Sequence, residues 1–221
     1  MNTTAGTRFP LPPEPPDQPP PGRSPWLPEP RPTAPGPVSA SSSVEVRAPD
    51  WLAERLVDQR VVALAGELDA ETANRAVATL ALLDASGDQP VQLRLSGVRV
   101  DLETSLALVD ALDLMGAPVH VTALGTLSGP AIALLAVGDV RRTGPHALLQ
   151  LVEPQPPRGV RGWDVEAWAA EHARQVRRLA ERLAQACGRP VEEVAADMRT
   201  GRLLGAEEAH GYGLVDAPAP R

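Results

Sequence analysis

The feature that most limits how this chain can fold is its uneven distribution of proline. Of the 25 prolines in 221 residues, 15 lie in residues 1–50 and only 10 in the following 171. A segment so rich in proline favours extended polyproline conformations and has few apolar side chains to bury. We therefore predict a disordered tail over residues 1–48 and a single folded domain over residues 49–217, since the remainder is too short for a second large domain.

The charge of the chain is concentrated in the predicted domain. All 21 basic residues are arginines, and after residue 49 there are 17 of them against 24 acidic residues, which accounts for the whole net charge of −7. Nucleic-acid binders carry a basic surface, so this balance argues against a nucleic-acid partner.

A single cysteine, Cys187, cannot form an internal disulfide and has no neighbours at metal-site spacing. We expect a cytoplasmic protein without a metal or cofactor.

Strand and helix patterns alternate regularly after residue 49. Apolar stretches predict strands over residues 60–66, 91–95, 119–124 and 147–152. Helical spacing of apolar residues predicts helices over residues 70–85, 102–115, 129–137, 165–186, 191–198 and 206–212. This βαβα order implies right-handed crossovers and an open, mostly parallel sheet of the α/β class.

Two segments allow more than one interpretation. Residues 116–138 lack charged side chains and are long enough to cross a bilayer. Pro118, Pro130 and His120 instead favour a strand, a glycine-rich turn and a buried helix, so no membrane partner is expected.

The helix over residues 165–186 has an apolar stripe opposite a face of Arg and Glu. It could cover its own sheet or project and pack against another subunit.

Several stretches resemble the proteolytic subunit of ATP-dependent Clp protease. RLVDQRVVALAGELDAETANRAVATLALLDA resembles the family's first strand and crossover helix, and VQLRLSG its second strand. GRPVEEVAADMRTGRLLGAEEAHGYGLVD resembles the C-terminal region most specifically. The resemblance covers about residues 50–217 and implies the Clp/crotonase-like fold, with repeated β-β-α-type units, a mostly parallel sheet and a long handle helix.

The same resemblance implies a serine nucleophile, a histidine base, an aspartate that orients the histidine, and backbone donors for the oxyanion. Without gaps, Gly129 occupies the serine position and Val152 the histidine position, while Asp197 matches the acid. Neither glycine nor valine can transfer a proton. For Asp197 we favour an ordinary role as a hydrogen-bonding carboxylate late in a helix.

Ser128 is the alternative nucleophile, in a register shifted by one residue. A lone serine at the start of a helix is more often an N-cap, which is the role we favour. His146 would lie roughly 20 Å from position 152 along an extended strand, so it cannot replace the base. The family's Ser-Pro-Gly-Gly turn is replaced by Gly97-Val98-Arg99-Val100, which puts side chains where bare backbone would face the substrate.

The favoured interpretation is a Clp proteolytic-subunit homologue that has lost serine peptidase activity and acts as a non-catalytic or regulatory ring subunit. The resemblance implies homo- or hetero-oligomers with related subunits and an AAA+ unfoldase as a possible partner. One alternative is an active Clp serine peptidase subunit that uses Ser128. Another is a crotonase-like acyl-CoA enzyme, because that superfamily shares the fold and uses an oxyanion hole without a serine.

Overall fold

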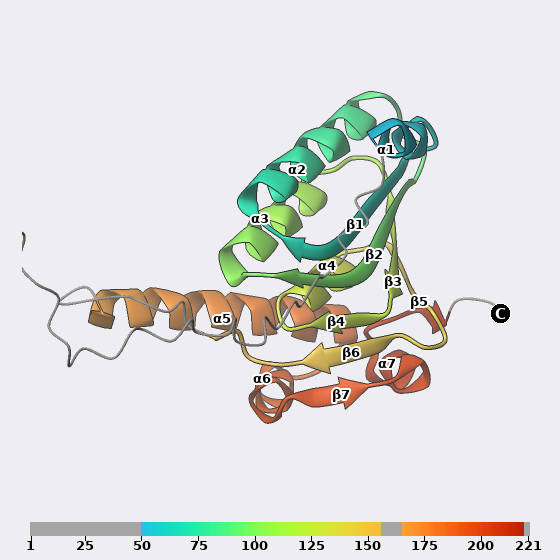
Figure 1. Cartoon of the computed structure of the whole chain (residues 1–221). Helices are drawn as coiled ribbons and strands as arrows, with labels where there is room; N and C mark the ends of the chain where they lie inside the picture. The colour runs from blue at the N-terminus through green and yellow to red at the C-terminus, as the bar shows by residue number, and fades with distance from the viewer. Residues whose placement is uncertain (1–49, 156–164, 219–221) are drawn as a thin grey trace, which may run out of the picture. The chain divides into compact units, whose positions relative to one another are not determined.

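The structure, a computed structural model, describes residues 50–155 and 165–218, which form two β-sheets with helices packed against them and include one short, fully buried helix (Figure 1). These residues all belong to one compact unit of the chain. The proline-rich segment predicted to be disordered lies outside the described residues. So do residues 156–164, which precede the predicted long helix.

Strands and helices alternate along the chain as predicted, in a mixed α/β fold. In chain order the elements are α1 (Asp50–Asp58), β1 (Val61–Leu68), α2 (Ala70–Ala85), β2 (Val91–Val100), α3 (Leu102–Asp113), β3 (Val119–Leu124), β4 (Thr126–Ser128), α4 (Ala131–Ala136), β5 (Val140–Thr143), β6 (Leu148–Leu151), α5 (Val165–Cys187), α6 (Val191–Thr200), β7 (Arg202–Leu204), α7 (Ala206–Tyr212) and β8 (Ala217–Pro218). The short strands β4, β5, β7 and β8 were not predicted.

The strands form two sheets rather than the single sheet predicted. Sheet A has the order β1-β2-β3-β5-β8 with all neighbours parallel, and sheet B has the order β4-β6-β7 with a parallel and an antiparallel pair. The chain leaves sheet A at Gly125, whose φ of 67° is readily adopted only by glycine. The Gly125 carbonyl accepts a hydrogen bond from the backbone N–H of Leu148, which aligns β4 with β6.

Two aspartates begin the crossover helices. Asp69 and Asp101 are the N-caps of α2 and α3, and their side chains accept hydrogen bonds from the backbone N–H groups of Thr72 and Thr104. Such caps satisfy N–H groups that have no partner within the helix. Asp69 directly precedes the helix that apolar spacing predicts over residues 70–85.

The core lies on one face of sheet A. Burial alternates along β2 and β3, so one face packs against helices while the other is more accessible. All six residues of α4 are buried against this core. In the segment considered as a membrane span, the structure forms β3, β4 and α4. Among the residues that the structure describes, no helix is long and apolar enough to cross a membrane.

The long helix α5 uses its two halves differently. Its buried residues, Leu179, Ala180, Leu183 and Ala184, all lie in the C-terminal half and belong to the core. The N-terminal half contributes no buried residue. The helix therefore covers its own domain over about half its length, and the rest of it extends past the core (Figure 1).

Candidate functional site

A cleft of about 1090 Å³ opens where β2 and β4 end. One wall is formed by residues 99–104, the floor by Ser128, Gly129 and Pro130, and the far side by residues 152–155. Trp168 and His172 of α5, whose rings stack with centroids 5.0 Å apart, form part of the rim. Gly129, Val152 and Ser128 are thus brought together in one cleft.

Gly129 and Val152 lie directly against each other. A Cβ atom placed on Gly129 would lie 3.4 Å from the carbonyl oxygen of Val152 and 3.5 Å from its Cγ1. Gly129 has φ +58° and donates its backbone N–H to the carbonyl of Gln150, 3.0 Å away, which fixes the turn between β4 and α4. The two positions that the resemblance pairs as nucleophile and base are therefore neighbours, and they meet through backbone and methyl groups.

Ser128 is not the N-cap of α4, and the interpretation of this residue as a helix cap is wrong. It is the last residue of β4, and α4 begins three residues later at Ala131, behind the N-cap Pro130, which makes no side-chain cap bond. The Ser128 Oγ donates to the Oε1 of Gln150, 3.1 Å away on the neighbouring strand β6. Strand pairing thus directs this hydroxyl to an amide oxygen, which is too weak a base to activate it.

The four histidines have other partners or none. His120 pairs with Gln92, His172 with the Pro154 carbonyl and His210 with the Val215 carbonyl. His146 is exposed in the turn before β6. Within residues 50–155 and 165–218, no imidazole forms a hydrogen bond with Ser128.

The oxyanion side of the cleft is a strand. β2 continues through Val100, and its last residues pair with β1, with Arg99 opposite Glu67 and Val100 opposite Leu68. Val98 is fully buried and Arg99 is exposed at the cleft. The prediction that side chains occupy this segment is consistent with the structure. What the sequence did not predict is that the segment remains part of the sheet.

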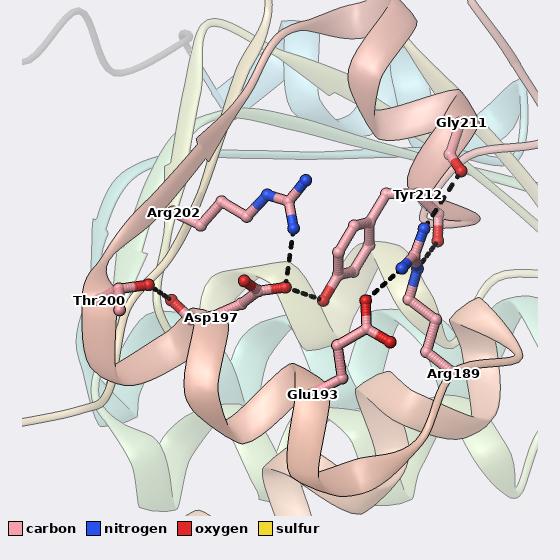
Figure 2. Close-up of polar contacts among 7 residues, drawn as sticks. All are labelled: Arg189, Glu193, Asp197, Thr200, Arg202, Gly211 and Tyr212. Atoms are coloured by element: carbon pink, nitrogen blue, oxygen red, sulfur yellow. Dashed lines mark hydrogen bonds and ion pairs between the residues drawn. The ribbon is translucent and has the colours of Figure 1, made fainter.

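Asp197 lies on the last turn of α6 and is held by two groups from later elements (Figure 2). Its Oδ2 accepts hydrogen bonds from the Tyr212 hydroxyl at 2.8 Å and from the Arg202 guanidinium at 3.0 Å. Burial, and next the hydrogen bond to Asp197, raise the pKa of the Tyr212 hydroxyl above its usual value. Tyr212 therefore remains a protonated donor throughout the physiological range.

Arginines surround the Tyr212 ring. The guanidinium carbons of Arg189 and Arg202 lie 4.2 and 5.1 Å from the ring centroid, distances typical of cation–π contacts. Arg189 also donates to the Tyr212 carbonyl at 3.0 Å and forms an ion pair with Glu193 (Figure 2). The acid position is thus part of a dense polar network that joins α6, β7 and α7.

The described residues contain no group of three His, Cys, Asp or Glu side chains arranged to hold a metal ion. Cys187, at the end of α5, is a free cysteine. Burial raises the pKa of its thiol to about 11, so very little reactive thiolate is present at neutral pH.

Comparison with known proteins gives this geometry a context. The family model for Clp protease matches residues 46–218. The chain belongs to the Clp protease family. It is 32% identical over 170 residues to ATP-dependent Clp protease proteolytic subunit 3 of Rhodococcus jostii (strain RHA1), covering 76% of this chain and 84% of that protein. It is 28% identical over 175 residues to the ATP-dependent Clp protease proteolytic subunit of Pleurastrum terricola, covering 77% of this chain and 89% of that protein.

Sequence reasoning missed two side chains that bond to Asp197. Arg202 and Tyr212 lie 5 and 15 residues after Asp197, and both belong to the C-terminal stretch that carries the strongest resemblance. The sequence offered one general signal for these two residues, namely that they lie in the C-terminal stretch with the most specific resemblance to the family. Nothing in residue type or spacing indicated that its tyrosine and arginine meet the acid.

Proposed function

We propose that this chain is a Clp proteolytic-subunit homologue without serine peptidase activity, which acts as a non-catalytic ring subunit. The observation that carries the proposal is the contact between Gly129 and Val152. A Cβ at Gly129 would lie 3.5 Å from the Val152 Cγ1, so the two positions are within reach of each other. Neither side chain can accept or donate a proton, and a serine-type mechanism needs both transfers.

The position of Ser128 supports the same proposal. Its hydroxyl is hydrogen-bonded to the Gln150 amide oxygen, and the imidazoles of the described residues bond elsewhere. Moreover, members of a catalytic triad act as a unit, and loss of one of them can lower kcat by about 10⁶. A displaced serine without a base would therefore leave the chain without measurable turnover.

A role in an assembly is supported by the relatives, which are named as proteolytic subunits of an ATP-dependent protease. We propose that this chain joins rings that contain catalytically active related subunits, with an AAA+ unfoldase as the partner of the assembly. The N-terminal half of α5 supports this idea, because it contributes no buried residue to its own domain and is available for contact with another subunit.

The loss of activity is tested with the purified full-length chain, using a fluorophosphonate probe and a fluorogenic peptide substrate. We expect no labelling and no hydrolysis, with the same result for Ser128→Ala. An active Clp proteolytic subunit serves as the positive control for both reagents. Labelling of the wild-type chain that Ser128→Ala abolishes would overturn the proposal in favour of a peptidase that uses Ser128.

The role in an assembly is tested by isolating an epitope-tagged chain from its native cell and separating the material by size. We expect it to elute in a large complex that contains a related proteolytic subunit with an intact catalytic triad. Recovery of the chain only as a monomer, free of any related subunit, contradicts the ring proposal and leaves the loss of activity to the probe experiment.

A further inference from the structure

The open face of sheet A carries the side chains that its helices do not cover. Along β2 and β3 buried residues alternate with accessible ones, and α2 and α3 lie on the side of the buried set (Figure 1). On the other side, Gln92 and Arg94 of β2 lie opposite His120 and Thr122 of β3. Arg142 of β5 continues the second row, because it is the partner of Thr122 in the register. The open face is therefore polar here, in contrast to the apolar face under the helices.

Two arginines flank the central strand β3 at the same level. The register places Arg94 opposite Thr122 and Thr122 opposite Arg142. Since neighbouring strands lie about 4.8 Å apart, the backbones of the two arginines are about 10 Å from each other. Both arginines are exposed, whereas Thr122 is only half exposed. Thr122 therefore lies between two longer and more accessible side chains.

The charges of these two arginines are not neutralised within the domain. In residues 50–155 and 165–218, neither Arg94 nor Arg142 forms a hydrogen bond or an ion pair. Arg141, on the opposite face of β5, is by contrast bonded to Asp216 and to two backbone carbonyls. The chain has 28 acidic residues against 21 basic ones, so carboxylates are in excess overall. The row of Arg94 and Arg142 is therefore a local positive surface on an acidic protein.

The next position along the same face of β3 is apolar. Leu124 lies two residues after Thr122 and is 39% exposed. Its Cδ2 lies against the backbone of Gly144, where an added Cβ would be only 3.2 Å away from it. The leucine is therefore packed on one side while much of its surface remains accessible. Along β3, a positive surface is followed by an apolar one.

We propose that the open face of sheet A binds a short acidic segment of another protein, with a carboxylate between Arg94 and Arg142 and an apolar side chain against Leu124. Arginine suits this role because its planar guanidinium pairs with a carboxylate through two parallel hydrogen bonds. An extended segment presents every second side chain on one side, about 6.6 Å apart, and this is also the spacing of Thr122 and Leu124 along β3. The partner therefore has an acidic and an apolar residue separated by one position.

This surface is separate from the cleft. None of its residues lines the cleft around Gly129 and Val152. The inference therefore adds a binding surface to the proposed function and does not depend on the loss of peptidase activity. A nucleic acid also offers anions to arginine, but the net charge of −7 repels a polyanion. A single carboxylate next to an apolar residue needs only the local positive charge, which favours a peptide.

The test measures binding of the blocked peptide Gly-Leu-Ser-Glu-Ser-Leu-Gly, labelled with an uncharged fluorophore, to the full-length chain. Its acidic residue has a leucine two positions away on either side, so the peptide fits in both chain directions. Fluorescence anisotropy at low ionic strength gives the Kd. We expect tighter binding than for the same peptide with glutamine in place of glutamate. In Arg94→Gln/Arg142→Gln, the Kd for the acidic peptide should rise about fivefold or more, because two charge-assisted contacts are lost.

The matched control is Arg178→Gln/Arg199→Gln. It removes the same total charge from exposed positions of α5 and α6, where neither arginine has a partner in the described part of the chain. We expect the Kd for the acidic peptide to stay within about twofold of the wild-type value, because distant exposed charges are screened. All four arginines are exposed, so both double variants should fold, which circular dichroism checks. Equal weakening by the two double variants would overturn the proposal.

The apolar contact is tested with Leu124→Ser. It should weaken binding of the peptide that contains leucine and leave unchanged the binding of a peptide with serine in place of both leucines. Equal effects on the two peptides would contradict the contact with Leu124.

Two further results would overturn the proposal as a whole. One is equal binding of the glutamate and glutamine peptides to the wild-type chain. The other is tighter binding of a single-stranded DNA oligonucleotide that depends on Arg94 and Arg142, which would assign the surface to phosphate groups. Labelling of the chain by a fluorophosphonate, by contrast, would overturn only the proposed function.

Discussion

The C-terminal ends of α6 and of β4 differ in how the residues around them are bonded. At the end of α6, Asp197 accepts side-chain hydrogen bonds from Tyr212 and Arg202, which belong to other elements. At the end of β4, Gly129 and Val152 meet through backbone atoms and a methyl group, and Ser128 donates one hydrogen bond to a neutral amide. The end of α6 is held by charged groups, whereas the end of β4 has only neutral contacts between the residues compared here.

The difference shows which of these side chains the fold itself requires. Replacing Asp197 would leave a buried tyrosine hydroxyl and a guanidinium without their acceptor, and an unsatisfied buried polar group costs about 1–3 kcal/mol. Glycine and valine at the other end leave no polar group unsatisfied. Glycine at position 129 and valine at position 152 therefore carry no penalty of this kind, whereas replacement of Asp197 would.

The largest expected effect compares the two ends through their glycines. Gly213, next to Tyr212, has φ +92°, and a Cβ there would lie 2.6 Å from the carbonyl oxygen of Cys187. Gly213→Ala should lower the free energy of unfolding by about 3 kcal/mol or more, measured by urea denaturation. Gly129→Ala, with φ +58° and no contact below 3.4 Å, should cost only about 1 kcal/mol. Equal losses would mean that the two ends are equally constrained.

Removal of single hydroxyl groups sharpens the same comparison. Tyr212→Phe deletes a buried donor to a carboxylate and should cost about 2 kcal/mol. Ser128→Ala deletes a partly buried donor to a neutral amide and should cost about 0.5 kcal/mol. Both values come from chemical denaturation at neutral pH. A larger loss of stability for Ser128→Ala than for Tyr212→Phe would mean that the Ser128 hydrogen bond, and not the Tyr212 hydrogen bond, contributes more to the stability of the fold.

A smaller effect depends on pH. Asp216 follows α7 and forms a hydrogen bond with Arg141. This hydrogen bond is the main reason why the pKa of the Asp216 carboxyl lies below its usual range. A carboxyl whose pKa is lower in the folded state adds stability above its unfolded pKa of about 3.9, and this contribution is lost as the pH falls through the folded value. Asp216→Asn should therefore flatten the loss of stability below about pH 4. The prediction is contradicted if the free energy of unfolding falls equally steeply below about pH 4 in the wild-type chain and in Asp216→Asn.

The smallest effect is expected on the exposed surface of α2. Arg75 and Glu71 form an ion pair on α2, with side chains 71% and 82% exposed. Arg75→Ala should change the free energy of unfolding by less than about 0.5 kcal/mol, because exposed pairs are screened and contribute little. A loss of stability as large as that of Tyr212→Phe would show that exposed polar contacts on α2 also stabilise the fold.

Most of the fold could be predicted from the sequence, and the failures have physical reasons. Helix α2 was predicted because Asp69 and the spacing of its apolar residues are local signals. Strands β4 and β5 were missed because TLS and VRRT are too short for a periodic pattern and are stabilised by pairing with distant strands. The division into two sheets depends on the turn at Gly125, whose direction no local pattern records.

The candidate site was predicted less completely. The positions of Gly129, Val152 and Asp197 came from the resemblance, and the structure places the first two in contact. Ser128 was wrongly predicted to be a helix N-cap. It is the last residue of β4, and that strand forms only by pairing with the distant strand β6. The Tyr212 and Arg202 contacts with Asp197 arise from the way α7 and β7 pack on α6, so only the folded chain could reveal them.

The unequal halves of α5 have a consequence for how its backbone amides exchange with solvent. Around Leu179 and Leu183 the helix is sealed into the core, so these amides should exchange with deuterium only through global opening. Toward Val165 the same helix lacks such cover, and opening of a few turns suffices. A single continuous helix should therefore show a steep gradient of protection along its length, and a second molecule bound to its exposed half would flatten that gradient.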